Sequence, residues 1–250
     1  MVRIMEQAIG FQTKRLTIFV GDYGSGKTEV SLNFAVALRA CKKRVKIVDL
    51  DIVNPYFRSR EASEILKSAG IELIAPGGEQ AWADLPIILP GIAGAIHDET
   101  ASVVLDVGGE AAGSRVLSSL FPETDGIDYD LLAVLNANRP FSGDADGSAS
   151  VLKRIEDASN LRVTGVVSNT HLLRETTPAI VLKGYKVAER LAKRLGIDVR
   201  FISVEEEVAE RLDASLFSVP IFVMKRYVLL PWEVVGTGAA ISERGSDGSG

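Results

Sequence analysis

The chain has 250 residues, of which 46% are hydrophobic and 24% charged, which is the composition of an ordinary globular domain. Its formal net charge of −5 argues against a protein that binds nucleic acid through bulk electrostatics. No apolar run is long enough to predict a membrane span, and residues 1–15 lack the hydrophobic stretch of a signal peptide. The single cysteine, Cys41, excludes an internal disulfide and is typical of a protein of the reducing cytoplasm.

Strand and helix patterns alternate along the chain. This alternation predicts an α/β fold of three layers, a mostly parallel sheet with helices on both faces. We expect one nucleotide-binding domain over residues 1–235 and a flexible Gly- and Ser-rich tail over 236–250. The predicted strands are Leu16–Val20, Arg44–Leu50, Ile71–Ile74, Ser102–Val107, Asp130–Leu135, Val163–Ser168, Val199–Val204 and Val219–Val223, and the predicted helices are Lys27–Cys41, Arg58–Ala69 and Thr176–Leu195.

The segment Ala75–Glu99 departs from this alternation. Its prolines and glycines break the pattern too often for one long helix. Two interpretations remain open, a connection packed on the core and a mobile flap near the functional site.

A glycine-rich loop follows the first strand and opens the first helix. Residues 21–28 read Gly-Asp-Tyr-Gly-Ser-Gly-Lys-Thr, a G-x-x-x-x-G-K-T phosphate loop in the strand–turn–helix context that the motif requires. The glycines let the backbone N–H groups face phosphate oxygens, and the helix N-terminus adds partial positive charge. We expect the lysine to reach the β- and γ-phosphates and the threonine to bind Mg²⁺. The predicted nucleotide-binding residues of the loop are Gly21, Asp22, Tyr23, Gly24, Ser25, Gly26, Lys27 and Thr28.

Aspartates end two of the predicted strands. Asp106 ends an apolar strand and is the expected partner for Mg²⁺, and Gly109 after it completes an Asp-x-x-Gly string whose glycine can sense a γ-phosphate. Asp49 and Asp51 follow the second strand on one side of it. We expect Asp51 to orient the attacking water or a metal-bound water, and Asp49 to be structural. Asp106 as a strand-end cap and Asp51 as a turn cap are the alternatives.

These motifs together resemble the MinD/ParA/ArsA class of P-loop ATPases, the SIMIBI or deviant-Walker-A group, over roughly residues 14–225. The resemblance implies that Lys27 and Thr28 bind ATP and Mg²⁺, that Asp51 assists hydrolysis, and that Asp106 belongs to the second switch. It also implies that Asn169, in Val-Val-Ser-Asn-Thr-His, reads adenine, since an amide can pair with both N6 and N7. A plain turn residue is the alternative for Asn169.

One residue departs from the family pattern. The family carries a lysine just after the first glycine, which reaches the phosphates of a partner in a nucleotide-dependent homodimer, and here that position is Asp22. A carboxylate beside a triphosphate is repulsive unless a cation intervenes. Either dimerisation differs, or an arginine supplies the charge, and the candidates, which are otherwise surface residues, are Arg58, Arg60 and Arg139.

The sequence therefore predicts a slow Mg²⁺-dependent ATPase that acts as a nucleotide switch for an unidentified protein partner. ATP is favoured over GTP because Asn169-Thr-His-Leu stands where GTPases commonly carry Asn-Lys-x-Asp. Two alternatives share the loop and the sheet. One is a small-molecule kinase or an ATP-dependent ligase of the dethiobiotin-synthetase type, and the other is a nucleotide-binding module with negligible turnover.

Overall fold

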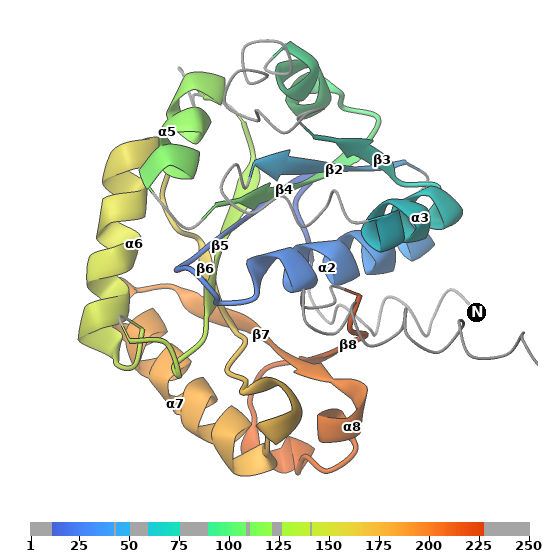
Figure 1. The fold of residues 1–250 in the computed structure, drawn as a ribbon. Helices are drawn as coiled ribbons and strands as arrows, with labels where there is room; N and C mark the ends of the chain where they lie inside the picture. Colours follow the sequence, from blue (N-terminus) through green and yellow to red (C-terminus); the bar gives the residue numbers. More distant parts are fainter. Residues whose placement is uncertain are drawn as a thin grey trace, which may run out of the picture.

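The computed structural model describes residues 12–42, 44–50, 60–75, 90–108, 111–121, 127–140 and 142–227. Its centre is an eight-stranded sheet in the order β3-β2-β4-β1-β5-β6-β7-β8, and every pair of neighbouring strands is parallel. Helices cover both faces of this sheet (Figure 1). The predicted three-layer α/β fold is therefore confirmed.

The elements follow one another in the alternation that the sequence predicts. Residues 90–97 form a further helix, which carries no label in Figure 1. The described elements are β1 (Leu16–Val20), α2 (Lys27–Cys41), β2 (Val45–Leu50), α3 (Arg60–Ala69), β3 (Glu72–Ile74), β4 (Ser102–Val107), α5 (Ala111–Leu120), β5 (Tyr129–Leu135), α6 (Ala145–Ser159), β6 (Gly165–Ser168), η2 (Leu173–Glu175), α7 (Pro178–Leu195), β7 (Asp198–Glu205), α8 (Glu206–Ala209), η3 (Ala214–Leu216) and β8 (Ile221–Met224).

The two faces of the sheet have separate cores. On one face α2 and α3 pack their apolar side chains against β1, β2 and β4, with Phe34 of α2 making edge-on and stacked contacts with Phe19 and Phe201 of the sheet. On the other face the helix over 90–97 and helices α5, α6 and α7 bury a larger cluster. These helices lie side by side along the sheet, as Figure 1 shows for α5, α6 and α7.

Strand β1 lies at the centre of the sheet, between β4 and β5. The chain leaves β1 through α2 toward the β2 side and later crosses to β5 on the opposite side. This reversal of strand order makes the carboxyl end of β1 a topological switch point, where parallel α/β sheets bind ligands. The loop at residues 21–26 emerges there, flanked by the ends of β4, β5 and β6.

Most predicted elements lie within two residues of the observed ones. The long helix predicted from Thr176 begins instead at Pro178, because Thr177 caps it by accepting a hydrogen bond from the Ile180 N–H at 3.4 Å. The sequence analysis did not identify α5 or α6. Within the segment 75–99, residues 90–97 are helical, and residues 76–89 lie outside the described residues.

Helix α2 is also attached to the chain that follows β8. The side-chain amide of Asn33 donates to the Lys225 carbonyl at 2.8 Å and accepts from the Lys225 N–H at 2.9 Å. One turn earlier, the Glu29 carboxylate accepts from the Tyr227 N–H at 2.8 Å. The last described segment therefore lies along the helix that begins at the loop. None of the described helices is long and apolar enough to cross a membrane.

Candidate nucleotide-binding site

The loop between β1 and α2 has the backbone that the motif predicts. Gly21, Gly24 and Gly26 have φ angles of 149°, 71° and 85°, which L side chains rarely adopt. A side-chain carbon on Gly21 would also lie 2.4 Å from the Val134 carbonyl oxygen of β5. Conformation therefore requires glycine at all three positions, and at Gly21 space requires it as well, so the loop can fold tightly against the end of the sheet.

Lys27 is the first residue of α2 and is buried despite its charge. Its ammonium group turns back over the loop and donates to the Asp22 carbonyl at 3.2 Å. The Ser25 N–H donates to the same carbonyl, also at 3.2 Å. The positive charge of Lys27 is thus directed toward the interior of the loop, next to the positive end of the helix dipole.

The end of β4 contributes a fully buried carboxylate, Asp106. Its Oδ2 atom accepts from the Thr28 hydroxyl at 2.7 Å, and its Oδ1 atom lies 3.2 Å from the Ser31 hydroxyl. Thr28 and Ser31 occupy neighbouring positions on one face of α2, spaced by three residues. The structure therefore brings together Thr28 and Asp106, two of the three residues predicted to hold Mg²⁺; the third, Asp51, lies outside the described residues.

Ser31 is a residue of this site that the sequence analysis missed. Its hydroxyl also lies 2.7 Å from the Lys27 carbonyl, in the position for a bond back to the previous turn. A hydroxyl residue four positions after the loop lysine, one helical turn on and between Val30 and Leu32, is the signal that identifies it in the sequence. Its contact with Asp106 fixes the second carboxylate oxygen.

Asp49 lies directly across from Asp106 in the register of β2 and β4. Both carboxylates are buried, and each lies two residues after a strand position, Ile47 or Val104, that packs in the core cluster of α2. By the alternation of side chains along a strand, both aspartates are therefore on the α2 face of the sheet. Asp51, predicted to orient water, and Gly109, predicted to sense the γ-phosphate, lie outside the described residues, as does Arg58. The structural role of Asp49 stays a prediction.

The oxygen atoms gathered here suit a hard divalent cation. A threonine hydroxyl and a carboxylate are ligands that Mg²⁺ accepts, with water and phosphate oxygens completing its octahedron. No cluster of three or more His, Cys, Asp or Glu side chains with metal-binding geometry occurs in the described part of the chain. Thr28 and Asp106 therefore fit a magnesium ion that arrives with a nucleotide.

Asn169, at the end of β6, is buried and contacts the loop itself. Its Nδ2 atom donates to the Ser25 carbonyl at 2.8 Å, and its Oδ1 atom accepts from the Ser203 hydroxyl at 2.9 Å. A side-chain carbon on Gly26 would lie 2.3 Å from the same Nδ2 atom. Asn169 thus packs against the start of α2. The two bonds leave one amide hydrogen and one carbonyl lone pair of its side chain unused.

His171 follows two residues later and faces the same glycine. Its Nε2 atom lies 3.4 Å from the position of a side-chain carbon on Gly26, and its Nδ1 atom accepts from the Leu173 N–H at 3.4 Å. Burial, followed by the positive charges of Arg139 and Arg226, lowers the pKa of His171 from 6.5 to about 4. The imidazole is therefore neutral at pH 7.

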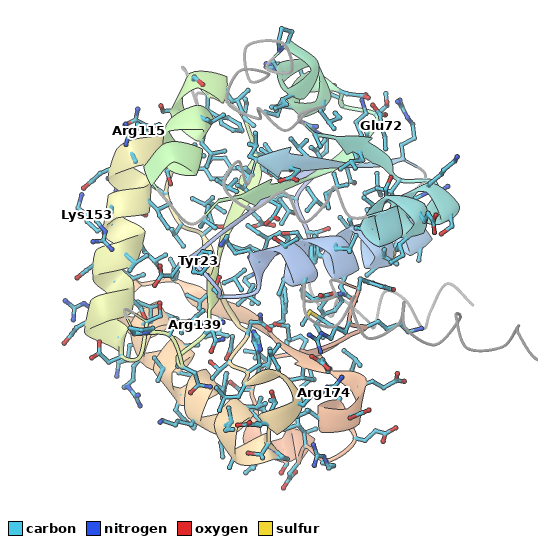
Figure 2. The ribbon with its side chains drawn as sticks, in the orientation of Figure 1. Tyr23, Glu72, Arg115, Arg139, Lys153 and Arg174 are labelled. Atoms are coloured by element: carbon cyan, nitrogen blue, oxygen red, sulfur yellow. The ribbon has the colours of Figure 1, made fainter. Side chains whose placement is uncertain are left out.

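The segment that follows β5 contacts the loop from the opposite side to Asp106. Arg139 donates from Nε to the Gly24 carbonyl at 2.8 Å, and the Ser142 hydroxyl lies 3.4 Å from Oδ2 of Asp22. The other carboxylate oxygen of Asp22 accepts from the Tyr23 N–H at 2.8 Å. Figure 2 labels Tyr23 at the loop and Arg139 beyond it. The structure thus places one of the three predicted arginines against the phosphate loop.

Comparison with known proteins identifies the same region of the chain. The family model described as CbiA, the CobQ/CobB/MinD/ParA nucleotide-binding domain, matches residues 16–211. A search of curated proteins gives no significant match.

Two solved structures illustrate the likeness of fold. The signal recognition particle 54 kDa protein of Aeropyrum pernix, in complex with GDP, is 17% identical with a TM-score of 0.53, over 80% of this chain and 45% of that one. Chloroplast FtsY of Physcomitrella patens is 17% identical with a TM-score of 0.50, over 85% of this chain and 66% of that one. At these identities the likeness establishes the α/β fold of the sheet and its helices.

Proposed function

Because the chain belongs to the CobQ/CobB/MinD/ParA family of nucleotide-binding domains, we propose that it is a Mg²⁺-dependent ATPase that hydrolyses ATP slowly. The observation that carries this proposal is the partly buried hydrogen bond between Thr28 and Asp106. It joins the phosphate loop to a carboxylate at the end of the neighbouring strand, where the hydroxyl and the carboxylate together would hold a magnesium ion that arrives with the nucleotide.

The residues of the loop have distinct roles in this reaction. Backbone N–H groups of residues 21–28 and the Lys27 ammonium hold the β- and γ-phosphates in line with the attacking water. Thr28 and Asp106 would hold Mg²⁺, which neutralises charge that develops on the phosphate oxygens. Asp51 orients the water and Gly109 senses the γ-phosphate, as the sequence predicts for these two positions. Catalysis is then mostly positioning and charge neutralisation.

Asn169 is the proposed contact with the base. Its spare amide hydrogen and lone pair match the N7 acceptor and the N6 donor of adenine. Guanine presents acceptors at both N7 and O6, so an amide also pairs with it through its donor alone. The structure of the signal recognition particle protein holds GDP, so ATP and GTP are the two nucleotides to compare.

Hydrolysis at this site would act as a timer for a protein partner. Loss of the γ-phosphate releases contacts near Asp51 and Gly109, and segments ordered by that phosphate change conformation. A nucleotide-dependent homodimer is one form of that partnership. The partner itself is a matter for experiment.

The test is the substitution of Lys27 by alanine. We expect Lys27→Ala to reduce phosphate release by about 100-fold or more, because the cation at the β- and γ-phosphates is lost. Nucleotide binding is measured by calorimetry and phosphate release by a coupled assay, each with ATP and with GTP. Lys153→Ala on the outer side of α6 (Figure 2) is the matched control and should change neither quantity. Undiminished phosphate release by Lys27→Ala would overturn the assignment.

A further inference from the structure

Arg139 is an exposed arginine that the structure holds on the outer side of the phosphate loop. Its Nε atom donates to the Gly24 carbonyl at 2.8 Å. A side-chain carbon on Gly24 would lie 2.7 Å from the Cζ atom and 2.8 Å from Nη2 of Arg139. The guanidinium therefore lies directly against the loop backbone at Gly24. A larger residue in place of Gly24 would prevent this close contact.

The segment that carries Arg139 is itself well anchored. The Ala137 N–H donates to the Thr170 hydroxyl at 3.0 Å, and the Asn138 side chain donates to the His171 carbonyl at 3.3 Å. Asn136 donates to the same carbonyl at 3.3 Å and its own carbonyl accepts from the Arg139 N–H at 3.0 Å. A surface arginine at the tip of a loose loop would lack these hydrogen bonds. The fold therefore determines the position of Arg139.

The charge balance of the loop indicates why an arginine is needed there. Asp22 places a carboxylate within the loop, where it raises the electrostatic cost of a bound triphosphate. The contacts of that carboxylate in the described structure are with the Tyr23 N–H and the Ser142 hydroxyl, both uncharged. Among the described residues, the ion pairs include none between Arg139 and a carboxylate. Its charge is thus directed at the loop and the space around it.

We propose that Arg139 is a phosphate-binding residue that acts in cis, supplying the positive charge that offsets Asp22 when the loop binds a nucleoside triphosphate. The guanidinium has five N–H donors, of which the Gly24 carbonyl takes one. The remaining donors form a planar fork suited to phosphate oxygens. This inference rests on the proposed function of the loop and adds one residue to it.

The first experiment separates charge from hydrogen bonding. Arg139→Gln can still donate to the Gly24 carbonyl but carries no charge, whereas Arg139→Lys keeps the charge without the fork. We expect Arg139→Gln to weaken ATP binding by about tenfold or more and ADP binding distinctly less, with Arg139→Lys between it and the wild type. Added guanidinium ion at millimolar concentration should restore part of the hydrolysis rate of Arg139→Ala. Arg162→Gln, an exposed arginine paired with Glu156 before β6, is the control and should match the wild type.

The outcomes are distinguishable from a failure of the proposed function. If Lys27→Ala abolishes nucleotide binding but Arg139→Gln binds ATP within twofold of the wild type, the role of Arg139 is refuted and the nucleotide site stands. If Arg139→Gln weakens ATP, ADP and AMP equally, Arg139 only supports the loop backbone, and the proposal is again refuted. If Lys27→Ala has no effect on binding, both proposals fail together.

A mixing experiment tests action in cis. If Arg139 acted on the nucleotide of a second copy, equal amounts of the Lys27→Ala and Arg139→Gln proteins would form sites with an intact lysine and an intact arginine. We expect no recovery of phosphate release above the mean of the two separate proteins. Recovery would refute action in cis.

Discussion

The two sides of the phosphate loop are held by different kinds of contact. On the magnesium side, defined here as Asp106, Thr28 and Ser31, one buried carboxylate binds two side-chain hydroxyls of α2. On the clamp side, defined as Asn169, Arg139 and Ser142, side chains from the ends of β5 and β6 contact the loop residues, two of them through backbone carbonyls at Ser25 and Gly24. The magnesium side presents a carboxylate and hydroxyls that could bind a cation, whereas the clamp side holds the loop backbone and carries the residues proposed to contact the base and the phosphates.

This difference predicts that the two sides can be separated by mutation. A hydrogen bond to a charged group contributes about 1.5–3 kcal/mol and a neutral one about 0.5–1.5 kcal/mol. Loss of charge on the magnesium side should therefore affect catalysis first. Loss of a backbone contact on the clamp side should affect nucleotide affinity and stability first.

The largest expected effect is that of Asp106→Asn. An asparagine keeps the size of Asp106, and its amide can accept from the Thr28 hydroxyl and donate to the Ser31 oxygen. The charge is lost, so we expect phosphate release to fall by about 100-fold while stability changes by less than about 1 kcal/mol. The measurements are a Mg²⁺ titration of phosphate release and urea unfolding.

Asp130→Asn is the matched control for this substitution. Asp130 is also a buried carboxylate of the sheet, but it lies near the start of β5 and faces Arg200 at 3.6 Å. Its substitution should leave the Mg²⁺ dependence of hydrolysis unchanged. If Asp106→Asn hydrolyses ATP at the wild-type rate with the same Mg²⁺ dependence, the magnesium side has no catalytic role and the comparison fails.

A smaller effect is expected for Asn169→Ala on the clamp side. The substitution removes the bond to the Ser25 carbonyl and leaves a buried backbone acceptor unpaired, at a cost of about 1–3 kcal/mol. The loop then samples other shapes, and we expect nucleotide affinity to weaken by about tenfold. Calorimetry with ATP and GTP measures the affinity, and urea unfolding measures the stability.

Asn33→Ala distinguishes loop shape from general stability. Asn33 is a buried asparagine of α2 whose amide binds backbone groups of Lys225, away from the loop. Its substitution should destabilise the protein by a similar amount without weakening nucleotide binding. Equal losses of affinity in the two variants would mean that the clamp side acts only through overall stability.

The same comparison explains what the sequence could predict. The loop, Lys27 and Thr28 are encoded locally, because glycines at fixed spacing before a lysine and a threonine have few other structural uses. Asp106 is then found as the aspartate at the end of a later apolar strand. The clamp side depends on the order of strands in the sheet. Asn169 bonds to Ser25 across 144 positions of sequence, and Arg139 to Gly24 across 115, so no local pattern shows that these residues meet.

Helices α5 and α6 were missed for different physical reasons. In α6, Val151, Leu152 and Ile155 have helical spacing after the capping residue Asp144, whose side chain accepts from the Gly147 N–H at 2.7 Å, so this pattern was available in the sequence. In α5, one glycine and three serines are poor helix formers. That helix depends on packing of Leu117 and Leu120 into the core, which the sequence alone does not show.

The smallest expected effect concerns His171, which lies beside the clamp side. Burial and the nearby Arg139 and Arg226 lower its folded-state pKa from 6.5 to about 4. The unfolded chain therefore binds the proton first, and the contribution of His171 to stability is complete above pH 6.5 and decreases as pH falls toward 4. Between pH 7.5 and pH 5 the wild-type protein loses free energy of unfolding as His171 is protonated in the unfolded chain. We expect His171→Asn, whose carbonyl can still accept from the Leu173 N–H, to make this decrease smaller by about 1–2 kcal/mol. Urea unfolding of both proteins across this range measures the difference. The positive charge of Arg139 is one cause of the lowered pKa of His171. The wild-type and Arg139→Gln proteins should therefore also differ in the pH dependence of their stability. Parallel curves for all three proteins would show that His171 is solvated and separate from the clamp side.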